Sequence, residues 1–64
     1  MTDKWIYDIF LEDGDVAIAN SGDEIFDTKE EALADAHDYI LSYLADEYKR
    51  QVNEFEIQIY QAMN

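Results

Sequence analysis

The stretch TKEEALADAHDYILSYLADEYKR, residues 28–50, decides the fold, because its apolar residues recur with a helical period. Thr28 stands three residues before Glu31, which is the spacing of a capping box at a helix start. Acidic residues crowd the beginning of the stretch and Lys49 and Arg50 its end, as the helix dipole prefers. The segment therefore predicts one helix that ends near Arg50. The residues expected on its buried stripe are Leu33, Ala36, Ile40, Leu44 and, more loosely, Tyr43.

On both sides of this helix the sequence alternates as a half-buried strand does. In residues 4–12 one face carries Trp5, Tyr7, Ile9 and Leu11, and the other carries Ile6, Asp8, Phe10 and Glu12. Because the second set holds the charges, we expect the first set to face the core. A second alternating strand follows the helix, with its inward residues at Phe55, Ile57 and Ile59.

The residues between the first strand and the helix predict two turns. Asp13-Gly14 is typical of a hairpin turn, because glycine tolerates the positive φ that such turns require. A second strand is expected after it, with Val16 and Ile18 inward and Ala17 and Ala19 outward. A turn over residues 20–23 and a very short edge strand over residues 24–26 complete the segment. The expected fold is a single α+β domain, residues 1–64: an antiparallel sheet of three to four strands in the order ββ(β)αβ, with one helix packed on one face.

Composition limits the class of protein. The chain has 16 acidic and 4 basic residues, a net charge of −12, and yet 48% of its residues are hydrophobic, which favours a folded domain over a disordered acidic chain. It has no cysteine, so disulfides and thiolate metal sites are excluded. No apolar run is long enough to span a membrane and no apolar signal-peptide stretch follows Met1, so we expect a cytoplasmic protein. Nucleic acid and anionic lipid would repel this charge, and neither is expected as a direct partner.

The sequence offers little catalytic chemistry. His37, the single histidine, stands near no positioned nucleophile, and we expect it to be a partly buried structural residue. Asp13-Gly14-Asp15 lacks the later oxygen ligands of a calcium loop, because Ala17 and Ala19 occupy those positions. We therefore expect no enzyme activity, no catalytic residues, no metal and no cofactor.

The acids themselves are the strongest candidates for a site. Glu31, Asp35, Asp38 and Asp46 are expected on the outer face of the helix. A solvated helix face is the ordinary interpretation, but such faces intersperse lysine, because like-charge neighbours destabilise a helix. This helix has no basic residue between Glu30 and Tyr48, which favours selection for a negative field.

A phosphate-like surface would need more carboxylates than the helix supplies. Glu31 to Asp46 would span about 22 Å, over which one DNA strand carries roughly six phosphates. A second row is therefore expected from the loop acids, and the sequence leaves open whether it lies on the same side as the helix row. The loop acids are Glu12, Asp13, Asp15, Asp23, Glu24 and Asp27.

The outer face of the sheet is a second candidate surface. Ile6, Phe10 and Tyr60 are expected there as an apolar patch rimmed by acids, as in a protein interface. The patch predicts either a homodimer or direct contact with a target. Two copies facing each other would bring Asp8 and Glu56 close to their symmetry mates, which opposes the dimer.

Two resemblances bear on function. Ser21-Gly22-Asp23, the helix opening Thr28-Lys29-Glu30-Glu31-Ala32-Leu33, and Tyr39-Ile40 resemble HicB-type antitoxin domains, which have a β-β-β-α-β order and a T-x-E-E-A-L helix start. This resemblance implies a protein-interaction module that neutralises a basic toxin. In size, charge and lack of catalytic groups the chain is similar to phage-encoded acidic inhibitors, including anti-CRISPR and other DNA-mimic proteins. That similarity implies a non-enzymatic inhibitor in the host cytoplasm, which blocks the basic nucleic-acid-binding site of a defence nuclease such as a CRISPR effector.

Overall fold

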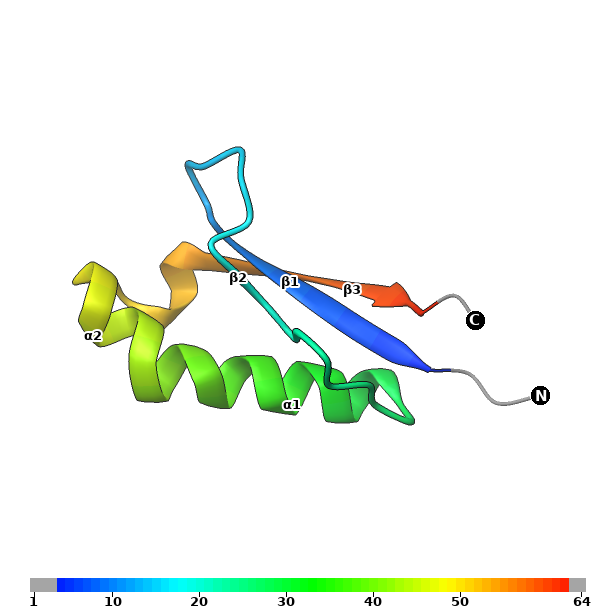
Figure 1. Cartoon of the computed structure of the whole chain (residues 1–64). Coiled ribbons are helices and arrows are strands. Elements are labelled where there is room, and N and C mark those ends of the chain that lie inside the picture. Colours follow the sequence, from blue (N-terminus) through cyan, green and yellow to red (C-terminus); the bar gives the residue numbers. More distant parts are fainter. Residues whose placement is uncertain (1–3, 63–64) are drawn as a thin grey trace.

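The computed structural model describes residues 4–62 and has two layers, a sheet and one long helix (Figure 1). The three strands are antiparallel in the order β2-β1-β3, and the helix crosses one face of the sheet. The α+β fold expected from the sequence is confirmed. In chain order the elements are β1 (Trp5–Leu11), β2 (Ala19–Asn20), α1 (Lys29–Tyr39), the π-helical turn η1 (Ile40–Leu44), α2 (Ala45–Tyr48), the 3-10 turn η2 (Val52–Glu54) and β3 (Phe55–Gln61).

The two long strands set the faces of the sheet. In the register of β1 and β3, Ile9 lies opposite Ile57 and Ile6 opposite Tyr60. Cross-strand partners point to the same face, so the alternation of each strand places one set against the helix and the other outside. Tyr7, Ile9 and Phe55 are buried, as expected from the sequence.

The second strand differs from the sequence-based expectation. β2 contains only two residues, and Val16 is 74% exposed instead of facing the core. Ala19 lies opposite Ile9 and packs against the core, although it was expected outside. Ile18, which was expected to face the core, does pack against it, so the segment before β2 is irregular and does not alternate between two faces.

The two turns beside β2 are closed by different contacts. The first turn is closed by the Gly14 amide, which donates to the Leu11 carbonyl at 2.9 Å, so Glu12 and Asp13 are its central residues. Positive φ occurs at Gly22 (61°) and not at Gly14, so the primed turn expected at Asp13-Gly14 is wrong. Gly22 lies in the second turn, where its amide donates to the Asn20 side chain at 2.8 Å. The edge strand expected over residues 24–26 is reduced to a single bridge between Trp5 and Phe26.

The helix buries residues that are four apart: Ala32, Ala36, Ile40 and Leu44. In an α-helix each step of four residues rotates the side chain by about 40°, so Leu44 would lie far round the helix from Ala32. The π turn η1, closed by the Ala45 amide on the Ile40 carbonyl, rotates less per residue and returns Leu44 to the core.

Two residues of the predicted buried stripe are exposed in the structure, each for its own reason. Tyr43 would face the sheet in a straight α-helix, but the π turn moves it aside and it is 61% exposed. Leu33 is 42% exposed, because the smaller Ala32 takes the position against the sheet.

Candidate functional site

The side of the helix that faces the β2 edge is organised by Tyr7. The ring of Tyr7 is only 3% exposed, and its hydroxyl donates a hydrogen bond of 2.7 Å to Asp35 Oδ2 on α1. Burial raises the pKa of the Tyr7 phenol, and the hydrogen bond to the Asp35 carboxylate raises it further. Tyr7 therefore stays a neutral donor and holds Asp35 at the flank of the helix.

A loop acid joins this cluster. The negative charge of Glu24, in the connection from β2 to α1, and the nearby Tyr39 also raise the pKa of Tyr7. Glu24 and Asp35 thus act on the same hydroxyl, one from the loop row and one from the helix row. Asp35, from the helix row, is the acid that contacts Tyr7 directly.

Two tyrosines lie next to this acid pair on the helix. The rings of Tyr39 and Tyr43 are 5.3 Å apart and tilted by 48°, and both are exposed. Sequence reasoning missed this pair, because Tyr43 was placed on the buried stripe. Their spacing of four residues was the available signal, since side chains four apart on a helix are neighbours. We call Glu24, Asp35, Asp38, Tyr39 and Tyr43 the acidic–tyrosine face.

The acids predicted to bind a partner are all exposed, but they differ in their local roles. Glu31 accepts the Asp27 amide at 3.2 Å, and its own amide donates to Thr28 Oγ1 at 3.1 Å, so Glu31 is part of the helix cap. Asp27 pairs with Lys4 and Asp13 with Arg50. The predicted acids without an ion pair in the described chain are Glu12, Asp15, Asp23, Glu24, Glu31, Asp35, Asp38 and Asp46.

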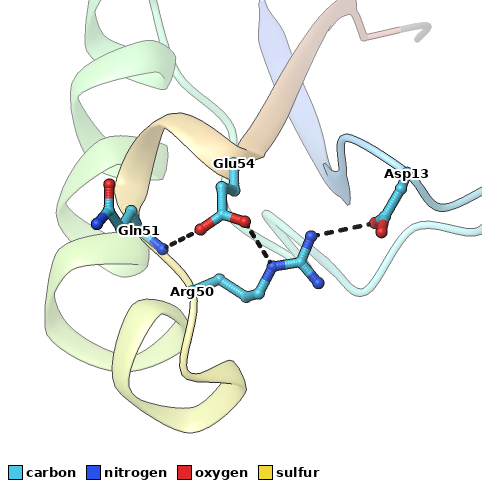
Figure 2. Close-up of polar contacts among 4 residues, drawn as sticks. All are labelled: Asp13, Arg50, Gln51 and Glu54. Atoms are coloured by element: carbon cyan, nitrogen blue, oxygen red, sulfur yellow. Dashed lines mark hydrogen bonds and ion pairs between the residues drawn. The ribbon is translucent and has the colours of Figure 1, made fainter.

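The first-turn acids form a group apart from the acidic–tyrosine face. Figure 1 shows the loop that follows β1 projecting from the end of the sheet near α2, whereas the connection to α1 descends to the opposite end of the helix. Arg50 joins the loop to the helix end: it contacts Asp13 at 3.3 Å and Glu54 at 2.9 Å, and the Gln51 amide donates to Glu54 at 2.8 Å (Figure 2). The Gln51 amide and then Arg50 lower the pKa of Glu54. The predicted acids therefore do not form a single continuous row.

Three of the four cations of the chain lie close to other groups of the protein itself. Lys4 and Arg50 form ion pairs, and Lys29 lies 5.2 Å from the centre of the Trp5 ring. Lys49 caps the helix in a left-handed conformation, with φ 57°. Within residues 4–62 no cation forms an ion pair with the acids of the acidic–tyrosine face.

The predicted apolar patch lies on the open face of the sheet. Ile6 and Phe10 are half-buried and Tyr60 is exposed. A polar row covers part of the face: Tyr60 Oη donates to Gln58 Oε1 at 2.8 Å, and Gln58 Nε2 donates to Glu56 Oε2 at 2.9 Å. His37, expected to be partly buried, is exposed on the helix.

Residues 4–62 form no pocket, and they contain no group of three or more His, Cys, Asp or Glu side chains placed to hold a metal ion. None of the described helices has the length and apolar character needed to cross a membrane. Comparison of the chain with protein-family models, with curated proteins and with solved structures finds no match.

Proposed function

We propose that this protein is a non-enzymatic inhibitor that acts in the host cytoplasm by occupying the basic nucleic-acid-binding site of a defence nuclease, such as a CRISPR effector. The observation that supports it is the acidic–tyrosine face, an exposed surface whose carboxylates have no cation of the described chain paired with them. Like-charge repulsion within this face works against folding, and a basic partner would relieve it.

The tyrosine pair supports the same proposal. Nucleic-acid sites present lysine and arginine to phosphate, and arginine also stacks on aromatic rings. Carboxylates beside exposed tyrosine rings allow arginine to make both interactions. Its guanidinium can pair with Asp35 or Asp38. It can also lie over the ring of Tyr39 or Tyr43. Tyrosine and arginine are also enriched where interfaces hold most of their binding energy.

The first experiment asks whether a partner is displaced by nucleic acid. A defence nuclease retained from host lysate by the immobilised protein at low salt should be released at high salt, because screening weakens the attraction. Its DNA or guide RNA should compete for the same site. A retained protein without a nucleic-acid site would contradict the proposal.

The second experiment tests the face with single charge reversals. The Asp38 side chain has no hydrogen bond or ion pair in the described chain. Asp38→Lys should therefore keep the fold and weaken binding about tenfold or more. Asp15→Lys makes the same change of charge at an exposed position in the loop after β1, apart from the acidic–tyrosine face, and serves as the control. Equal losses in the two variants would show an effect of net charge alone and would reject the helix face as the site.

The alternative is a HicB-like module that neutralises a basic toxin. The Thr28 cap, in which the Glu31 amide donates to the Thr28 hydroxyl, favours it, whereas the third strand of the HicB order is reduced to the bridge between Trp5 and Phe26. Competition decides between the two functions: a basic toxin without a nucleic-acid-binding channel would bind the acidic–tyrosine face and would not be displaced by DNA.

A further inference from the structure

The side of the molecule away from β2 ends in an open strand edge. The Glu12 amide donates to the Glu54 carbonyl at 2.9 Å, and the Ala62 amide donates to the Lys4 carbonyl at 2.7 Å, in the register of β1 and β3. Bonded pairs alternate in an antiparallel ladder, so the even-numbered residues of β3 bond β1. Ile57 and Ile59 therefore direct their N–H and C=O groups away from β1. No strand of the described chain lies on that side.

This edge lacks the usual protection against pairing. Edge strands are normally short or carry lysine, proline or a bulge. β3 has seven residues, FEIQIYQ, and its single charge is Glu56. In a chain of net charge −12, the longest open edge is thus nearly uncharged.

An apolar flank of the helix adjoins the open edge. The Tyr7 hydroxyl donates to Asp35, and the Tyr7 ring stacks on Phe26. Phe26 bonds Trp5 on the β2 side of β1, so the Asp35 flank of α1 lies toward β2. Leu33, His37 and Leu41 follow one another at intervals of four on the other side of the buried stripe, and they therefore lie toward β3. Leu33 is 42% and Leu41 62% exposed.

We propose that β3 and this leucine flank form the interface of a symmetric dimer, in which β3 pairs antiparallel with β3 of a second copy about a two-fold axis at Gln58. Gln58 is the middle residue of Phe55–Gln61, so this register pairs the whole strand. The free groups of Ile57 then bond those of Ile59 of the partner subunit. Glu56 faces Tyr60 of the partner subunit, so no two carboxylates are directly opposed across the paired strands.

The helix layer fits the same axis. α1 packs over both β1 and β3. Strands are about 4.8 Å apart, so an axis at the free edge of β3 places the two helices about 10 Å apart. Packed helices are separated by about 8–10 Å, so the two leucine flanks would meet. The acidic–tyrosine faces would lie at the outer ends of a six-stranded sheet.

Sedimentation equilibrium of the full chain tests the dimer. Because each copy carries −12, the wild type should associate more tightly as NaCl is raised from about 0.05 to about 0.5 M. Leu41→Asp should weaken association by about tenfold or more, whereas Ser42→Asp adds the same charge at the next exposed position and should have a much smaller effect. A monomer at about 1 mM protein in high salt would overturn the proposal.

Cross-linking tests the register. The chain has no cysteine, so Gln58→Cys introduces a single thiol. Residues opposite each other at a non-bonded position have Cα atoms about 4.5 Å apart, within the range that a disulfide spans. Oxidised Gln58→Cys should form a covalent dimer with an unchanged circular dichroism spectrum, and Ser42→Cys should form no covalent dimer. Equal cross-linking of the two variants would overturn the register, and dissociation by Phe10→Asp instead of Leu41→Asp would assign the dimer to the open sheet face.

Discussion

Tyr7 is the residue that joins the two layers of the molecule by a polar contact. Its ring is buried, its centroid lies 6.0 Å from that of Phe26, and its hydroxyl reaches Asp35 on the helix. The same residue thus contributes to the core and fixes one acid of the proposed binding face. Asp35 has a structural role as well as its proposed role in recognition, so Asp38 is the cleaner test of binding.

Replacement of Tyr7 by phenylalanine should lower the free energy of unfolding by about 1–2 kcal/mol, because the hydrogen bond to a charged acceptor is lost. Urea denaturation measures the change. Asp35→Asn keeps an acceptor oxygen and should cost less. An unchanged urea midpoint in Tyr7→Phe would show that the contact adds nothing to stability.

The raised pKa of Tyr7 also predicts a dependence on pH. Above about pH 10 the unfolded phenol loses its proton and the folded phenol keeps it, so the free energy of unfolding falls as pH rises through this value. Below pH 10 the contribution is fully present. Stability curves of the wild type and Tyr7→Phe should therefore converge at alkaline pH, and parallel curves would contradict the shift.

Lys49 carries backbone strain at the end of the helix. Its φ of 57° lies in the left-handed region, where a side chain costs about 1 kcal/mol and glycine costs little. Lys49→Gly should raise the urea midpoint relative to Lys49→Ala, which removes the same charge and keeps the Cβ. A lower urea midpoint in Lys49→Gly than in Lys49→Ala would show that the left-handed conformation of Lys49 does not reduce stability.

At the scale of the element, the helix contacts the sheet through small residues. Ala32 and Ala36 are fully buried, which allows α1 to lie close to β1. The π turn then keeps Ile40 and Leu44 on the same side although the buried positions are four apart. The close position of α1 on the sheet and the π winding of η1 therefore both keep the buried side of the helix against the sheet.

Ala36→Leu should destabilise the fold by about 1–3 kcal/mol, because the added atoms have no space between helix and sheet. Ala34→Leu makes the same substitution at an exposed position of the same helix and should leave stability nearly unchanged. Thermal and urea unfolding of the pair measure the difference. Equal effects would show that α1 is not closely packed at Ala36.

At the scale of the whole molecule, charge is distributed unequally. The edge at β3 and the leucine flank carry little charge, while the β2 side carries the acidic–tyrosine face. Salt should therefore act in opposite directions on two kinds of binding. It weakens binding to a basic target and strengthens self-association, since it screens attraction in the first case and repulsion in the second.

Much of the architecture follows from local patterns in the sequence. The alternation in residues 5–11 and 55–61 assigns the two faces of the long strands, because side chains alternate whatever lies next to the strand. The Thr28 cap starts the helix where its hydroxyl and Glu31 predict, because capping needs only neighbouring residues. The exposure of the predicted acids also follows, since an unpaired charge is costly to bury.

Tertiary structure alone decided the rest. The burial of residues 16–19 depends on an irregular loop, in which Ile18 and Ala19 both pack against the core and Val16 is exposed. The π turn that exposes Tyr43 depends on Ile40 and Leu44 reaching a core that other elements complete. The contact of Tyr7 with Asp35 joins two separate segments, so no sequence period contains it. Contacts between distant residues are set by how layers pack, and local periodicity carries no information about that packing.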